Sequence, residues 1–224
     1  MAYGFLVRKG NKTIMDSDFP NLMFDSKGTL SLSLHSSSST AKLVTNHDGS
    51  NTGPVYFDEY RGGIARPLEG QVLFFEVPAG RRVYAGYYTD GTVMVYSNAS
   101  SIRWVKARYM RYLPEPPTGS YGMFVRDAQG RFTYSSTETY LNVTGTLYSA
   151  TSGIWVAPST HGFYGSGNTS ADSAGLYFDQ GVRNNAGTLI PEALRGLVQR
   201  DIPASDSRWS KVRGLVADIT WSEL

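Results

Sequence analysis

The feature that most constrains the fold of this chain is an internal repeat. Residues 3–8 read Tyr-Gly-Phe-Leu-Val-Arg, and residues 121–126 read Tyr-Gly-Met-Phe-Val-Arg. Further along, Gly-Thr-Leu at residues 28–30 recurs at residues 145–147, so the order of the matches is kept. Matches that keep their order at a nearly constant offset are typical of a duplicated structural unit. The sequence therefore predicts two related halves.

A third match and a proline-rich segment bear on the boundary between the halves. Tyr-Phe-Asp occurs at residues 56–58 and again at residues 177–179. Residues 114–119 read Pro-Glu-Pro-Pro-Thr-Gly, and proline disfavours strand pairing because it has no amide hydrogen to donate. We therefore predict an N-terminal domain of residues 1–113, a linker of residues 114–119 and a C-terminal domain of residues 120–224.

The composition favours strands over helices. The chain of 224 residues has 15 Tyr, 10 Phe and 24 Gly, a mixture that suits pleated strands joined by tight turns. Each copy of the repeat also opens with a short apolar segment, a polar turn and a second apolar segment, which is the pattern of a β-hairpin. The predicted fold is all-β, with two tandem related β-sandwich-like domains.

Several later segments carry local signals. The dense apolar run at residues 71–77 predicts a strand in the centre of a sheet. The dipeptide Asp90-Gly91 predicts a two-residue hairpin turn. Residues 191–200 fit either a short helix or a strand, whereas the alternation at residues 214–221 predicts a final strand.

Residue usage argues against several classes of chemistry. The chain has no cysteine, so it has no disulfide, no thiolate metal ligand and no cysteine nucleophile. Its three histidines, His35, His47 and His161, lie in polar segments without ligand spacing, and no Gly-x-Ser-x-Gly motif is present. We predict that the protein is not an enzyme and binds no metal and no cofactor.

The charges are few and unevenly divided. The formal net charge is +2, with 13 basic and 9 acidic residues in 1–113 and 8 basic and 10 acidic residues in 114–224. Neither half is basic enough to indicate a nucleic-acid partner. No apolar run near the N-terminus is long enough for a signal segment or a membrane span. We expect a protein made and kept in the cytoplasm, with no membrane span.

Residues 103–112 hold the one local concentration of positive charge, mixed with aromatic residues. Such a strand is typical of a protected sheet edge or of a subunit interface. A surface that binds phosphates and stacks bases is the less favoured reading. The candidate interface residues are Arg103, Trp104, Lys106, Arg108, Tyr109 and Arg111.

Two further sets of side chains suggest binding or catalysis of carbohydrates. Aromatic residues in the second half could stack on sugar rings, and Trp155 and Tyr164 are the candidate glycan contacts. A pair of carboxylates beside strong strands could in principle cleave a glycan, although capping of strand ends and turns is the favoured use. The carboxylates in question are Asp58, Glu59, Glu76 and Asp179.

Ala2-Tyr3-Gly4, followed by a short apolar strand, a polar turn and a second strand ending near Asp16, resembles the opening of small structural proteins of tailed bacteriophages. Those proteins are components of the tail tip, baseplate or tail fibre. The resemblance implies a non-enzymatic virion protein of the tail that is synthesised in the host cytoplasm. It also implies a homo-oligomer, with a trimer favoured, that contacts other tail proteins and can attach to a glycan or receptor of the host surface. A carbohydrate-binding or receptor-binding β-sandwich module is the alternative.

Overall fold

The computed structural model confirms that the fold is all-β. It describes residues 6–9, 12–16, 22–46, 51–87, 91–109, 121–126, 129–130, 132–147, 150–158, 163–166, 174–200 and 214–224. These residues form strands and one short 3-10 helix, η1 (Trp221–Glu223). No helix of the described residues has the length and apolar character needed to cross a membrane.

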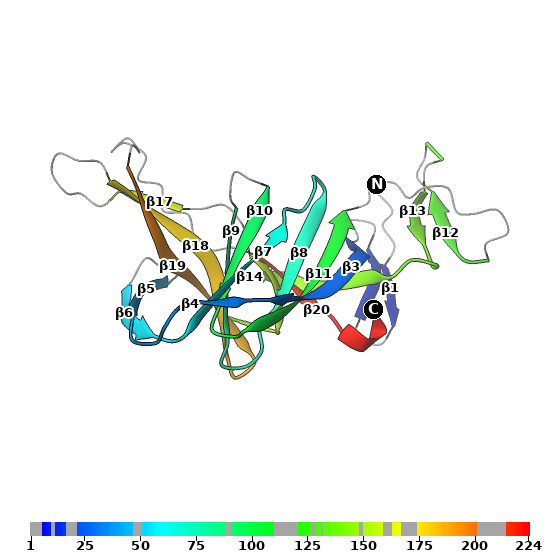
Figure 1. The fold of residues 1–224 in the computed structure, drawn as a ribbon. Coiled ribbons are helices and arrows are strands. Elements are labelled where there is room, and N and C mark those ends of the chain that lie inside the picture. Colours follow the sequence, from blue (N-terminus) through cyan, green and yellow to red (C-terminus); the bar gives the residue numbers. More distant parts are fainter. Residues whose placement is uncertain are drawn as a thin grey trace.

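Six strands close into a barrel in the order β11, β3, β14, β20, β16, β8 (Figure 1). Three of them come from each side of the proline-rich segment. Their bounds are β3 (Leu22–Ser31), β8 (Gln71–Glu76), β11 (Ser101–Tyr109), β14 (Tyr140–Leu147), β16 (Trp155–Pro158) and β20 (Gly214–Asp218). The apolar cluster of the barrel contains Phe74, Val105, Trp155 and Ala217, so both halves supply its core. The prediction of a central strand at residues 71–77 is confirmed, because β8 pairs with β11 and β16.

A ten-stranded antiparallel sheet packs against the barrel. Its main path runs β4, β7, β10, β9, β18, β19, β5, β6, with β15 paired to β19 and β17 to β18. The bounds are β4 (Ser33–Ser36), β5 (Ala41–Asn46), β6 (Asn51–Tyr56), β7 (Glu59–Ala65), β9 (Arg82–Tyr87), β10 (Thr92–Ser97), β15 (Thr151–Ser152), β17 (Phe163–Ser166), β18 (Ala174–Asn185) and β19 (Thr188–Arg200). A second apolar cluster joins barrel residues such as Phe75 and Val156 to sheet residues such as Val83 and Val95.

Two hairpins stand outside both sheets and confirm the hairpins predicted at the start of each repeat. They are β1 (Leu6–Lys9) with β2 (Lys12–Asp16), and β12 (Phe124–Arg126) with β13 (Phe132–Ser135). Figure 1 shows β1, β12 and β13 at the end of the molecule opposite β5, β6 and β17. Both hairpins have a register shift at the same step, between Val7 and Arg8 in one and between Val125 and Arg126 in the other. The two copies therefore share strand pairing as well as sequence.

The barrel shows how the two halves are related. Gly28 and Gly145, which match in the repeat, lie 117 positions apart. Met23 and Tyr140 are also 117 positions apart, and they pair directly with each other between β3 and β14. Equivalent residues of antiparallel strands face each other only where a local two-fold axis passes between them. The axis therefore passes between Met23 and Tyr140.

The opposite side of the barrel provides an independent check on this axis. Gly28 pairs with Trp104, which in turn pairs with Phe75. In the second half, Gly145 pairs with Val216, and Val216 pairs with Val156. These two series of steps predict that Phe75 and Val156 are equivalent, and the two residues pair directly with each other. The barrel is thus a closed pseudo-two-fold ring of three strands plus three.

The ten-stranded sheet follows the same symmetry. The sequence of neighbours β7, β10, β9 in the first half corresponds to β15, β19, β18 in the second. The two sets meet where β9 pairs with β18, and Val83 faces Val182 in this pair. The hairpin formed by β5 and β6 has no counterpart among the described strands of the second half.

The predicted division into two tandem domains at residues 114–119 is not confirmed, because both large sheets combine strands from the two sides of that segment. The physical reason is that the three barrel strands of either half alone would have unpaired edges. The three barrel strands of the first half leave β3 and β8 each without a second neighbour, and β14 and β16 supply those neighbours. Each half therefore needs the other to satisfy its backbone hydrogen bonds.

Three other sequence expectations are decided by the topology. Residues 191–200 form part of strand β19 rather than a helix. The Tyr-Phe-Asp match is not a structural equivalence, since residues 56–58 end β6 and continue toward β7, whereas residues 177–179 lie inside β18. The prediction of a final strand is confirmed by β20, which ends at Asp218.

The repeated glycines give a test of the packing between β3 and β11. A Cβ atom on Gly28 would lie 2.7 Å from Cζ2 of Trp104, whereas nothing lies within 4 Å of a Cβ on Gly145. We expect Gly28→Ala to lower the free energy of unfolding by about 1–3 kcal/mol, because the indole ring must shift in a packed site. Gly145→Ala is the matched control and should change it by less than about 1 kcal/mol. Urea unfolding of both variants measures this, and equal effects would contradict the register of Gly28 with Trp104.

Candidate functional site

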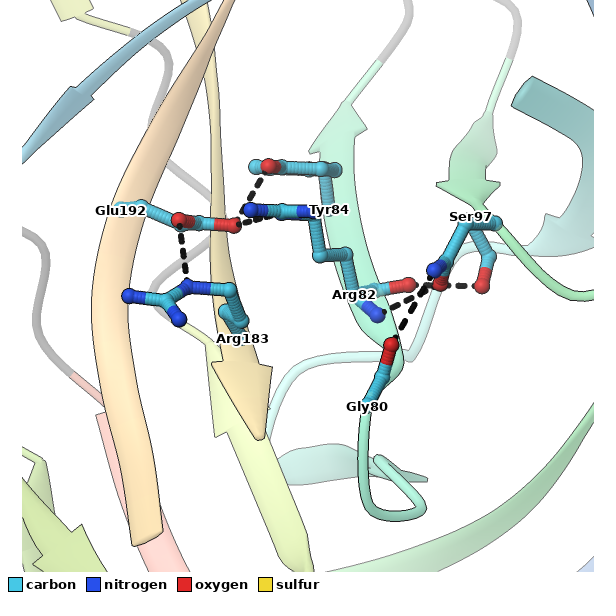
Figure 2. A network of polar contacts seen from close by, with 7 residues as sticks. Gly80, Arg82, Tyr84, Ser97, Arg183 and Glu192 are labelled. Atoms are coloured by element: carbon cyan, nitrogen blue, oxygen red, sulfur yellow. Dashed lines mark hydrogen bonds and ion pairs between the residues drawn. The ribbon is translucent and has the colours of Figure 1, made fainter. Parts of the chain in front are cut away.

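The most buried ionised group of the described residues is the carboxylate of Glu192 on β19, whose side chain is 2% exposed. The Tyr84 hydroxyl donates to Oε1 at 2.6 Å, and Nε of Arg82 donates to the same oxygen at 2.9 Å. Nε of Arg183 lies 3.5 Å from Oε2. Figure 2 shows the three side chains converging on the carboxylate from β9 and β18. One anion is therefore shared by two cations and a phenol.

The sheet register explains why this anion is needed. Arg82 and Arg183 face each other directly where β9 pairs with β18, and like charges at such positions repel. Glu192 pairs with Gly181 on the other side of β18, which places its carboxylate beside both arginines. The network ties the two halves together at the pseudo-two-fold axis.

The phenol of Tyr84 is a donor in this network. Burial raises the pKa of Tyr84 well above its usual value, and the negative charge of Glu192 raises it further. The hydroxyl therefore stays protonated at neutral pH and donates to the carboxylate. The arrangement fixes the position of the Glu192 carboxylate. The Tyr84 phenol acts as a hydrogen-bond donor and not as a base.

A second polar cluster surrounds Glu59 of β7. The carboxylate accepts from the Ser36 hydroxyl at 3.4 Å and lies 4.0 Å from Nε2 of His35. Lys42 is buried nearby, where its ammonium group donates to two backbone carbonyls of the turn between β4 and β5 and lies over the ring of Phe57. Burial raises the pKa of Glu59, and the charges of Lys42 and His35 oppose this shift.

The raised pKa of Glu59 predicts a specific pH dependence. The folded state holds this proton more tightly than the unfolded state, so its stabilising contribution is complete below the ordinary pKa of 4.5 and is lost as pH rises through the folded value. Glu59→Gln cannot titrate. In urea titrations the variant should therefore be more stable relative to the wild type at pH 7 than at pH 4. The exposed Glu69→Gln is the control, and a difference that does not change with pH would contradict the burial of this carboxyl group.

A third polar cluster lies against the core of the barrel. Nε and Nη2 of Arg103 donate to the two carboxylate oxygens of Glu76, and the guanidinium group lies 5.2 Å from the ring centre of Trp221. Trp221 of η1 stacks on Trp155 at 5.8 Å, and its carbonyl accepts from Nζ of Lys27 at 3.0 Å. The C-terminal helix is thereby fixed to the barrel through both charge and aromatic contact.

The predicted interface segment is not a sheet edge. Strand β11 pairs with β3 on one side and β8 on the other, inside the closed barrel. Arg103 is engaged by Glu76, and Trp104 and Arg108 are half-buried. Lys106 lies 6.0 Å from the ring centre of Trp104. Tyr109 alone is exposed among the described residues of this set, and Arg111 lies outside the described residues.

The candidate carbohydrate residues are placed as follows. Trp155 is 1% exposed within the barrel, so its ring is not available to a sugar, and this part of the glycan hypothesis is not supported. Tyr164 belongs to β17, and its side chain lies outside the described residues. Asp58 accepts from the backbone N–H of Ser38 at 2.7 Å, as favoured for a turn residue. Glu76 is bound by Arg103, and the side chain of Asp179 lies outside the described residues.

Sequence analysis did not single out Glu192, although a signal for it existed. In a strand, residues two apart share a face, and Glu192 shares its face with the buried Leu194. A carboxylate on an apolar face predicts a buried partner of opposite charge. The partners Arg82 and Arg183 could not be found this way, since their positions depend on which strands pair.

Across the described ranges, no group of three or more His, Asp or Glu side chains could hold a metal ion. Of the histidines, His35 contacts the Tyr96 ring edge-on, while His47 and His161 lie outside the described residues. Comparison of the chain with protein-family models, with curated proteins and with solved structures finds no match.

Proposed function

We propose that this chain is a non-enzymatic structural protein of a phage tail, in the tail tip, baseplate or tail fibre, that acts by assembly. The observation that supports the proposal most is the closed pseudo-two-fold barrel, in which three adjacent strands of one half close against three adjacent strands of the other, so that the chain folds as one interlocked body. A particle component must hold its shape under load, and interlocked halves cannot separate without breaking the barrel.

The state of the buried carboxylates supports a structural role over catalysis. Glu76, Glu192 and Glu59 are the three buried acidic residues of the described part of the chain, and each has an arginine or lysine side chain nearby. A general acid or nucleophile needs an accessible carboxyl group facing its substrate. These carboxylates instead lie beside arginine or lysine side chains.

The proposal includes a homo-oligomer, with a trimer favoured, and contacts to other tail proteins. It is tested first by the mass of the purified protein in light scattering, because symmetric particle components assemble through repeated contacts. A stable trimer or hexamer is the expected result. A monomer at all concentrations, together with absence of the protein from purified virions in mass spectrometry, would overturn the proposal.

A further inference from the structure

An exposed tyrosine stands at the start of the second copy of the repeat and has no role in the described core. Tyr121 is 97% exposed and Met123 is 49% exposed, just before strand β12. The same residue type stands at Tyr3 in the first copy of the repeat. Equivalent core positions, by contrast, hold different residues in the two halves: Phe75 of the first half corresponds to Val156 of the second. Both copies of the repeat have a tyrosine at this position, and the tyrosine of the second copy is exposed, which points to a contact with a partner.

The surrounding residues hold this surface in a fixed conformation. The backbone N–H of Met123 donates to Oγ of Ser136 at 2.8 Å, and the N–H of Ser136 donates to the Met123 carbonyl at 2.9 Å. A Cβ atom on Gly122 would lie 2.7 Å from the same Oγ, so the glycine of the repeat is explained by packing. No comparable packing explains Tyr121. We call Tyr121, Met123 and the turn at residues 136–138 the Tyr121 surface.

The hairpin anchors the Tyr121 surface to the barrel. Phe132 of β13 packs on Met23, one of the two residues at the pseudo-two-fold axis. Nη1 of Arg126 donates to the carbonyl of Gly130 at 2.6 Å, and the guanidinium group lies 3.6 Å from the centre of the Phe132 ring. An exposed tyrosine on a fixed support loses little conformational entropy on binding, which favours its use as an anchor.

Charge indicates which partner this surface takes. The first half carries 13 basic and 9 acidic residues, a net +4, and the second carries 8 and 10, a net −2. Opposite net charges on the two halves favour a contact of the second half of one copy with the first half of the next. A contact of this head-to-tail kind closes into a ring when the rotation between copies allows it.

We infer that the Tyr121 surface binds the first half of a second copy of this chain and so builds the homo-oligomer. This inference rests on the proposed function, which requires self-assembly but does not assign the contact. Aromatic side chains and methionine are enriched in the centres of such interfaces, in agreement with the composition of the Tyr121 surface.

The test compares light-scattering masses of three full-length proteins at the same concentration. The double variant Tyr121→Ser/Met123→Ser removes the apolar contact from exposed positions, and Ile154→Ser is the control because Ile154 is 41% exposed on the second half and lies outside the Tyr121 surface. The wild type and the control should form the oligomer, whereas the double variant should be monomeric with unchanged circular dichroism.

The results distinguish a wrong assignment of the contact from a failure of self-assembly. An assembled double variant would overturn the Tyr121 contact while leaving the proposed function in place. A monomeric wild type would count against self-assembly itself. If the wild type assembles but both the Ile154→Ser control and the double variant are monomeric, this would also contradict the assignment of the contact to the Tyr121 surface.

Discussion

Gly181→Ala is expected to lower the free energy of unfolding by about 3 kcal/mol or more, beyond the usual cost of overfilling a packed site. A Cβ atom at Gly181 would lie 2.2 Å from the Val83 carbonyl oxygen and 2.4 Å from Cδ1 of Tyr84. The first of these neighbours is backbone, so a change of rotamer cannot relieve the contact. Strands β9 and β18 would have to separate, and with them the two halves.

Urea unfolding followed by circular dichroism measures this effect, with Gly145→Ala as the control of equal chemistry at an open position. If Gly181→Ala does not fold while Gly145→Ala does, the failure is due to the crowded site at residue 181 and not to alanine in a strand of this half. A Gly181→Ala protein as stable as the wild type would contradict the close approach of β9 to β18.

Removal of the buried charge at Glu192 should have the second large effect. Glu192→Ala is expected to cost about 3 kcal/mol, the lower end for a broken buried ion pair, because Arg82 and Arg183 are partly exposed. The two arginines would face each other without an anion, and Tyr84 would lose its acceptor. Glu192→Gln should cost less than Ala, because its amide oxygen can still accept from the tyrosine.

Thermal and urea unfolding of both variants, beside the exposed Glu69→Gln control, measures this difference. A double-mutant cycle makes it specific to the charge: Arg183→Met should cost less in the Glu192→Gln background than in the wild type, since the arginine there has no anion to bind. Additive costs in this cycle would show that Glu192 and Arg183 do not interact and would contradict the network.

Local structure could be predicted from the sequence where local patterns determine it. The two hairpins at the start of each repeat, the central strand β8 and the final strand β20 follow from alternation, apolar runs and turn residues. The segment at residues 191–200 illustrates the limit. Its apolar positions fit a helix or a strand equally well, and it becomes strand β19 because β18 and β5 flank it.

The interlocking of the halves could not be predicted, because a strand pattern indicates that neighbours are needed without naming them. The repeat predicted two equivalent units, and a proline-rich segment between them suggested separate domains. Whether β3 pairs within its own half or with β14 depends on the closure of a barrel from distant strands. The Glu192 network was missed for the same reason, since its arginines meet only after β9 and β18 pair.

The central claim is that the two halves pair as equivalents around a pseudo-two-fold axis, and a disulfide between Met23→Cys and Tyr140→Cys tests it most directly. The adjacent pair is hydrogen-bonded, with the Phe24 N–H donating to the Thr139 carbonyl at 2.8 Å. Residues 23 and 140 thus form a non-hydrogen-bonded pair, whose Cα atoms lie about 4.5 Å apart, within reach of a disulfide. The natural chain has no cysteine, so any disulfide is unambiguous.

Met23→Cys with Gly145→Cys is the control, because residue 145 lies five positions further along the strand, about 17 Å away. Peptide mass mapping after mild oxidation of dilute, folded protein should find residues 23 and 140 linked within one chain, and the control pair free. Free thiols in the folded Met23→Cys/Tyr140→Cys protein, or equal linkage in the control, would contradict the pairing of the two halves at this axis.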